Sequence, residues 1–473
     1  MSAINPDKYL ATIAVGMLGL LTVGILTDQP LVLPVCIVIG AVIYAVIYHL
    51  RWCLNAVMFM TPLSMELELS GGIGLDFPGE IGLIGLSIAT ITMMVTYGTP
   101  KKFINRISFC LLLQLLWVAV VSILAEHQLI SFKYLFAKVW YILPFYVLPF
   151  YLVRTDRQLH QLLDWFIVGV MIGGVYFFAR HLMNGFDFAG RVNIGQPLWR
   201  NHVNYACTLV CSLPIVWYRE RTTTSSPWVY RLLAICLLVF IHLAYARVAY
   251  LCIGAALLVY WVIRLRLVIP SLIGIIASLL TLWSVAIKDL QYVAFAPEYE
   301  RAITQNDFGS KLVATFNKQD ISSMERVHRW VAGMHMSADR PIVGFGPANF
   351  YSSYRPYTIH SFETYVSDNP ERSGIHCYYL MILVEQGWPG LLLFVIIGVI
   401  ALLRCQSLYH HASDPSYRQL VLMVAMILVM ILTLNLINDM IEVIKIGSLY
   451  FFCFFLLYYQ AAASTQEEKL ICS

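Results

Sequence analysis

The chain has 473 residues, of which 59% are hydrophobic and 12% are charged, and its formal net charge is +4. Soluble domains carry about 25% charged residues, so this chain cannot cover a water-exposed surface of its size. Most of its surface must face lipid, where each segment satisfies its own backbone hydrogen bonds. Composition therefore excludes an ordinary soluble domain and predicts an all-α polytopic membrane protein. No basic block with interleaved aromatic residues indicates a nucleic-acid partner.

Apolar stretches of roughly 17–25 residues can cross a bilayer as helices, and we expect about 12–14 such spans here. The stretch 9–27 follows a short polar segment without a small-residue cleavage site, so it is expected to remain as a first helix. The stretch 52–64 is short, and 374–404 is too long for one straight span, so Gly387-Trp-Pro-Gly390 predicts a break there. The expected spans are 9–27, 31–50, 52–64, 80–97, 107–124, 135–153, 161–183, 202–218, 229–245, 247–264, 267–287, 374–404, 418–437 and 444–460.

Basic residues indicate the orientation of these spans, because Lys and Arg are enriched in cytoplasmic turns. With the N-terminus inside, nearly every basic turn is cytoplasmic, whereas turns 28–30 and 65–79 hold no Lys or Arg. We therefore expect an N-terminal bundle (1–287), one large loop on the outer face (288–373) and C-terminal helices with a cytoplasmic tail (374–473). The inner turns hold Arg51, Lys101, Lys102, Arg106, Arg154, Arg157, Arg219, Arg221, Arg231, Arg264, Arg266, Arg404 and Arg418.

Cysteine and histidine placement indicates neither disulfides nor a metal site. Of the 11 cysteines, only Cys377 is expected near the outer face, so a disulfide-stapled outer domain is not predicted. No Cys/His spacing resembles a zinc site.

Arginines at the outer edge need an explanation, because a cation at the end of a span is costly unless it is paired, snorkels or serves a ligand. Arg247 lies in a tight junction between two spans. It is either an interface residue, with Asp439 or Glu442 as a partner, or a phosphate-binding group whose guanidinium grips phosphate oxygens.

Two further groups of residues are expected on the same face. Arg191, Arg200 and Asn204 precede or begin an outward-starting span, and Asn204 is either a helix cap or a substrate contact. A helical patch is expected from 322 to 338, within which Arg326 and Trp330 are four residues apart and share one face, with Arg329 between them. An ordinary surface helix with a stacked Arg/Trp pair would show the same pattern.

The last candidate lies where the long loop re-enters the membrane. His376 is either structural or a base, because imidazole is suited to proton transfer near neutral pH. Glu385 follows nine residues later, roughly on the opposite side of a continuous helix, so we do not expect it to orient His376 directly. We also expect substrate contacts from Arg372, Tyr379 and Glu385. Together, arginines and a histidine on one side suit an anionic substrate, a diphosphate, and a hydroxyl to be deprotonated.

These residues occur in an order that resembles the bacterial O-antigen ligase and O-antigen polymerase family. The resemblance is strongest from about 190 to 405. The chain departs from the family in its larger expected number of spans and in Cys377, where a small polar residue is common. The residues that carry the resemblance are His376, Leu380, Glu385, Gly387 and Gly390, preceded by Arg326, Trp330, Pro341, Gly344 and Gly346, the span pair around Arg247, and Gly190, Arg191 and Asn204.

The resemblance implies a metal-independent, GT-C-like membrane glycosyltransferase without a cofactor. Such enzymes take a glycan from undecaprenyl diphosphate at the periplasmic face. A ligase passes it to lipid A–core and a polymerase passes it to another lipid-linked glycan, and both alternatives remain open. By position, Arg247 and Arg326 would bind the diphosphate and His376 would be the base or the acceptor-positioning residue. A single back-side attack would invert the anomeric centre.

Two alternatives belong to other classes. A lipid-linked oligosaccharide flippase or other transporter also has many spans, but transporters often show internal repeats and midplane sites, and no repeat is visible here. A chain-length partner protein would have few spans and a long helical outer domain. A flipping assay with a labelled lipid-linked sugar distinguishes the transporter from the enzyme.

Overall fold

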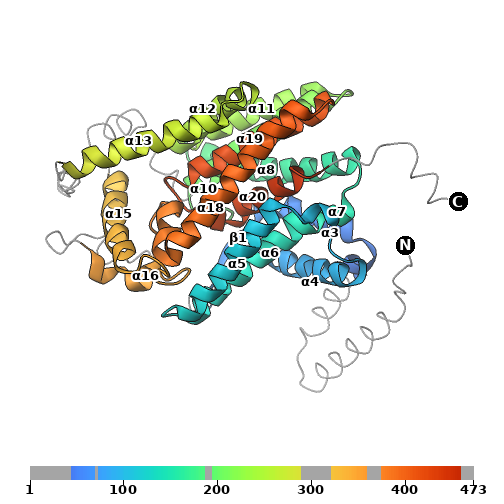
Figure 1. Ribbon diagram of the computed structural model, residues 1–473. Coiled ribbons are helices and arrows are strands. Elements are labelled where there is room, and N and C mark those ends of the chain that lie inside the picture. Colours follow the sequence, from blue (N-terminus) through green and yellow to red (C-terminus); the bar gives the residue numbers. More distant parts are fainter. Residues whose placement is uncertain (1–43, 70–72, 187–193, 289–320, 359–373, 460–473) are drawn as a thin grey trace, which may run out of the picture.

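The computed structural model describes residues 44–69, 73–186, 194–288, 321–358 and 374–459, and this part of the chain is almost entirely helical (Figure 1). Within it, 7 helices are long and apolar enough to cross a membrane, and three shorter apolar helices accompany them. The protein is therefore an all-α polytopic membrane protein, as its composition predicts. The expected span 9–27 and most of 31–50 lie outside the described residues.

Within each described stretch of the chain, consecutive helices are joined by short connections. Several expected spans match closely, since α12 occupies the predicted range 247–264 and α10 begins at the predicted residue, His202. The elements are α3 (Leu50–Met60), η1 (Thr61–Leu63), β1 (Met65–Leu69), β2 (Ile73–Phe77), α4 (Gly79–Tyr97), η2 (Lys101–Phe103), α5 (Arg106–Leu124), α6 (Gln128–Ile142), η3 (Leu143–Val147), α7 (Pro149–Leu152), α8 (Asp156–Met183), α10 (His202–Thr222), α11 (Pro227–Leu243), α12 (Arg247–Arg264), α13 (Val268–Lys288), α15 (Ile321–Asp339), α16 (Phe350–Ser353), η6 (Arg355–Tyr357), α18 (Tyr378–His411), α19 (Pro415–Leu434), η7 (Met440–Glu442) and α20 (Ile444–Leu456).

A small β-hairpin occupies the turn expected at 65–79. Its strands β1 and β2 pair antiparallel, with Met65 opposite Phe77 and Leu69 opposite Ile73. The preceding helix α3 is only 11 residues long and tightens into η1. The short third span is therefore followed by a hairpin, which sequence patterning did not reveal.

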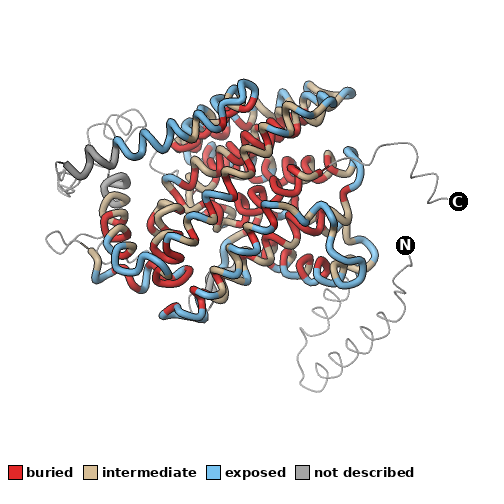
Figure 2. Tube along the Cα trace, in the orientation of Figure 1, coloured by how far each residue is buried: buried red, intermediate tan, exposed pale blue. Residues whose placement is uncertain are grey.

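Helices α19 and α20 form the buried centre of the bundle. Almost every side chain of α20 is buried, as is most of α19, and Figure 2 shows buried positions concentrated in the middle of the bundle. The surrounding helices expose large apolar side chains, among them Ile88, Phe109, Leu258 and Ile273. An exposed apolar surface of this kind is what lipid contact requires.

Hydrogen bonds between helix ends define two ends of the bundle. At the basic end, which carries the arginines of the predicted inner turns, Tyr459 donates to Asp156 across 3.0 Å and Tyr218 bonds His160 across 3.1 Å. At the opposite end, which we call the loop end, the backbone N–H of His127 donates to Asn349 across 3.2 Å. The alternation of helix directions that the basic turns predicted is therefore present in the described part of the chain.

Candidate active site

Helix α18 is broken at Gly387, where φ is 67° and ψ is −173°. The break leaves backbone carbonyls without the usual helical partner. The carbonyl of Val384 accepts from the N–H of Phe345 at 3.0 Å, that of Glu385 accepts from Gly346 at 2.9 Å, and that of Gln386 accepts from the Trp117 indole at 2.8 Å. The predicted break is confirmed, and the segment before α16 docks into it.

Glycines make this docking possible. Gly344 and Gly346 adopt φ values of 64° and 96°, in the left-handed region that favours glycine. A Cβ on Gly387 would collide with the backbone oxygen of Ile342, because the two chain segments touch there. These glycines of the family-like pattern therefore have a structural role, which is to join the long loop to α18.

Glu385 faces this joint and not His376. Its side chain is 2% exposed, and its Oε1 accepts a hydrogen bond from the N–H of Phe350 at 3.2 Å. The expectation that it does not orient His376 agrees with this geometry. Its placement favours support of the loop over direct substrate contact.

His376 lies just before α18, on a backbone fixed from both sides. On one side, the Trp330 indole of α15 donates to the carbonyl of Ile375 at 3.1 Å. On the other, the N–H of Tyr378 donates to the carbonyls of Asn435 and Asn438, at 2.9 and 3.2 Å. His376 itself has a φ of 54°, an uncommon conformation for a residue with a side chain. The packing around it thus determines where the imidazole lies.

The imidazole lies among predicted arginines and one carboxylate. Its Nδ1 is 3.8 Å from Oδ1 of Asp439, and its side chain remains partly exposed. Burial first, and then the positive charges of Arg326, Arg329 and Arg200, lower the pKa of His376 to about 3. The imidazole is therefore neutral near pH 7 and able to accept a proton. The structure brings these three arginines close enough to His376 to act on it electrostatically.

Arg329 is the most informative of these arginines. It is 3% exposed, and its Nε has no hydrogen-bond partner among the described residues. A buried charge normally requires a paired anion, because desolvation of an ion costs several kcal/mol. The position beside His376 is therefore suited to an anionic ligand.

Arg200 approaches the site from the start of α10. It is 57% exposed at the side chain, and its Nη1 lies 4.0 Å from Oε1 of Glu66 on the hairpin. The cap of α10 is Asn201, whose side chain accepts from the N–H of Asn204 at 2.9 Å. The capping role considered for Asn204 is wrong, because the helix begins earlier than that assignment requires.

Arg247 is the first residue of α12, which runs antiparallel to α19. The Cys252 thiol donates to the carbonyl of Met430 across 3.8 Å. With a rise of about 1.5 Å per residue, Arg247 then lies at the level of Asn435, at the loop end. Glu442, one partner considered for Arg247, instead pairs with Lys138 at 2.7 Å.

The remaining candidate residues either face another helix or lie outside the described part of the chain. Tyr379 donates to the carbonyl of Leu432 at 3.1 Å, so its hydroxyl faces α19. Arg191 and Arg372 lie outside the described residues. From the sequence, Asp439 was considered only as a partner of Arg247, since a lone carboxylate after an apolar span carries no recognisable motif. Burial raises the pKa of Asp439, while nearby backbone N–H groups and Arg200 lower it.

A metal site of clustered ligands is not found in the described part of the chain. No group of three or more His, Cys, Asp or Glu side chains there is placed to hold a metal ion. The metal independence implied by the resemblance stays a prediction.

Part of the chain matches a known protein family. Residues 232–395 match the sequence model of the O-antigen ligase family. The match covers about a third of the chain, so this part of the protein is similar to that family. No curated protein matches the chain. The matched region runs from α11 into α18, so it includes Arg247, Arg326, Arg329, His376 and the glycine joint. The match supports a membrane protein with a ligase-like or polymerase-like function in glycan processing.

Proposed function

We propose that this protein transfers a glycan from an undecaprenyl diphosphate carrier to an acceptor hydroxyl at the periplasmic face of the bacterial inner membrane. The observation that carries the proposal is the buried guanidinium of Arg329 beside the neutral imidazole of His376. A diphosphate supplies the anion that the arginines require. The loop end is assigned to the periplasm because the opposite end holds the basic turns.

The chemistry follows from these groups. The acceptor oxygen attacks the anomeric carbon and forms the new glycosidic bond, while the bond from that carbon to the diphosphate oxygen breaks. Arg326 and Arg329, together with Arg247 at the same end, neutralise the negative charge that develops on the leaving diphosphate. His376 accepts the proton of the attacking hydroxyl, and Asp439 stabilises the resulting imidazolium. Direct displacement inverts the anomeric centre and requires no metal.

A deletion strain tests the function. If the protein is a ligase, long chains attached to lipid A–core disappear and lipid-linked polymer accumulates. If it is a polymerase, a single repeat unit remains attached. Unchanged surface glycan would contradict both versions of the proposal.

Complementation of that strain tests the residues. We expect His376→Ala and Arg247→Ala to abolish detectable transfer while the protein still accumulates in the membrane, because one electrostatic donor typically contributes ~10²–10³ in rate. Near-normal transfer by either variant would remove that residue from the mechanism.

A further inference from the structure

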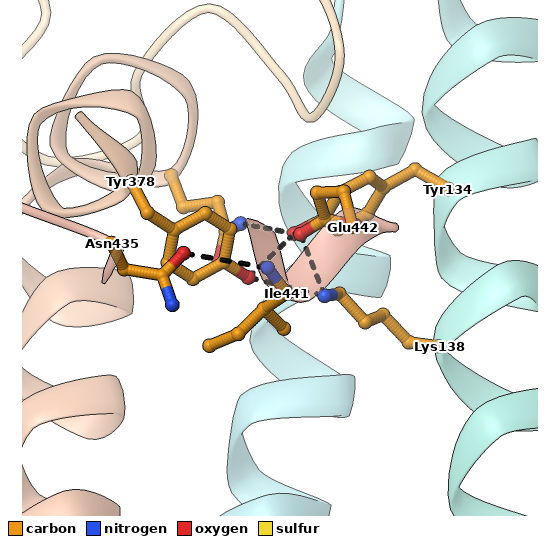
Figure 3. Close-up of polar contacts among 7 residues, drawn as sticks. Tyr134, Lys138, Tyr378, Asn435, Ile441 and Glu442 are labelled. Atoms are coloured by element: carbon orange, nitrogen blue, oxygen red, sulfur yellow. Dashed lines mark hydrogen bonds and ion pairs between the residues drawn. The ribbon is translucent and has the colours of Figure 1, made fainter. Parts of the chain in front are cut away.

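A buried ion pair lies beneath His376, within the bundle. Nζ of Lys138 on α6 is 2.7 Å from Oε1 of Glu442 on η7, and Lys138 is 8% exposed (Figure 3). The same Oε1 accepts from the Tyr134 hydroxyl at 3.0 Å. Ionisable residues within a membrane bundle are costly to bury and usually have a functional role. The mechanism above uses neither Lys138 nor Glu442.

The pair is connected to His376 through Tyr378. The Tyr378 hydroxyl accepts from Lys138 at 3.1 Å, and its backbone N–H donates to Asn435 and Asn438. Hydrogen bonds therefore hold both the hydroxyl and the backbone of Tyr378, which lies two residues after His376 in the sequence. Figure 3 shows the Tyr378 ring between Asn435 and the Lys138–Glu442 pair.

Through Glu442, the ion pair also reaches the other side of the His376 imidazole. It follows Asp439 in the turn between α19 and α20, and the N–H of Glu442 donates to the carbonyl of Asp439 at 3.3 Å. Asp439 in turn faces Nδ1 of His376 at 3.8 Å. One ammonium group on α6 thus fixes both the chain that carries the imidazole and the turn that carries its carboxylate neighbour.

We propose that Lys138 is a positioning residue, which acts through Glu442 and Tyr378 to hold His376 and Asp439 in the geometry needed for proton transfer. This inference rests on the proposed transferase function. A displacement of about 1 Å at a reacting group can cost about 10²-fold in rate. Loss of the ammonium should therefore lower turnover without weakening binding of the donor.

The test compares variants of the purified full-length protein, with an undecaprenyl-diphosphate-linked oligosaccharide as donor and, in separate assays, lipid A–core or a second lipid-linked glycan as acceptor. We expect Lys138→Met to lower kcat about 10²-fold, with the donor KM within about twofold of wild type. Tyr378→Phe removes only the hydroxyl and should lower kcat roughly tenfold. Lys138→Arg should recover most of the activity, since a guanidinium can pair with Glu442 and a small cavity beside Lys138 gives it room.

Arg219→Met is the matched control. Arg219 is also buried and pairs with Asp164 at 2.8 Å, but at the basic end. It should reduce the amount of folded protein about as much as Lys138→Met, while the folded fraction keeps its kcat. Equal loss of kcat in both variants, or normal kcat in Lys138→Met, would overturn the positioning role.

The same experiment separates this inference from the proposed function. Absence of transfer by the wild-type protein overturns the transferase function and the positioning role with it. Transfer by wild type that His376→Ala abolishes and Lys138→Met leaves intact overturns the positioning role alone.

Discussion

The two ends of the bundle use positive charge differently. At the basic end, Arg219 makes two hydrogen bonds to Asp164, each 2.8 Å long, and Arg264 stacks over Tyr260 at 5.2 Å. At the loop end, Arg329 is buried beside His376, and its Nε has no hydrogen-bond partner in the described part of the chain. Arg219 and Arg264 are therefore stabilised by partners within the protein, whereas Arg329 is placed to bind a ligand.

The loop end also joins two chain segments through residues with an uncommon backbone conformation. Left-handed residues at the loop end include Gly344, Gly346, Gly387 and His376, which join the long loop to α18. Uncommon backbone conformations persist only where the surrounding structure enforces them, and they cluster at functional sites. The loop end is therefore built to fix a few side chains, and the four predictions below compare it with the rest of the bundle.

The largest effect is expected from two glycines of the same helix. Gly387→Ala introduces a Cβ at a φ of 67° and against the Ile342 backbone, so the break in α18 cannot form. We expect little folded protein and no detectable transfer. Gly398→Ala meets only the Leu432 side chain at 3.6 Å and should be neutral or slightly stabilising. Immunoblots of membranes measure the amount of folded protein, and a glycan assay measures transfer. Normal transfer by Gly387→Ala would show that the break in α18 does not require a glycine.

Next in size is the comparison of two arginines. Arg329→Met should lower transfer about 10²-fold while the protein still accumulates, because in the proposed mechanism the guanidinium stabilises the leaving diphosphate. Arg231→Met at the basic end breaks an exposed pair with Glu220 and should change transfer less than about twofold. Initial rates with a labelled lipid-linked donor measure both. Comparable losses in the two variants would mean that Arg329 has no special role.

The pH dependence of transfer should show a smaller effect. Protonated imidazole cannot accept a proton, so a base contributed by His376 is lost as pH falls through its pKa of about 3. The transfer rate of the wild-type protein should therefore not fall near pH 6 through protonation of His376. Arg200→Gln removes one of the charges that lower the pKa of His376 and should move the acid limb upward. Rates measured between pH 3 and 8 test this, with Arg221→Gln at the basic end as the control, and an acid limb near pH 6 in the wild-type protein that His376→Gln removes would contradict it.

The smallest expected effect concerns two asparagine caps. Asn201 caps α10 at the loop end and Asn105 caps α5 at the basic end, through hydrogen bonds of 2.9 and 3.0 Å. Either Asn→Ala variant should cost about 1 kcal/mol of stability. Only Asn201→Ala should also reduce transfer, because it loosens the residue after Arg200. Thermal unfolding in detergent and measured transfer rates distinguish the two variants. Equal transfer rates would mean that Arg200 does not contribute to the site.

The sequence predicted local structure well where the signals are local. The break in α18 follows from Gly387-Trp-Pro-Gly390, and the helical patch 322–338 matches α15, which spans Ile321–Asp339. It did not reveal the Lys138–Glu442 pair, whose members are 304 positions apart. The Asn201 cap was missed because a chemically equivalent asparagine follows it closely.

The sequence by itself determined that the chain is a bundle of membrane helices with its basic turns on one side. Hydrophobic length and charge are local properties, and lipid allows few alternatives to a helix. Only the tertiary structure decided which candidates surround His376, that Glu385 faces the loop joint, and that Asp439 lies beside the imidazole. Those placements depend on packing between distant helices, because each charge or carbonyl buried in the bundle must find its partner in another segment of the chain.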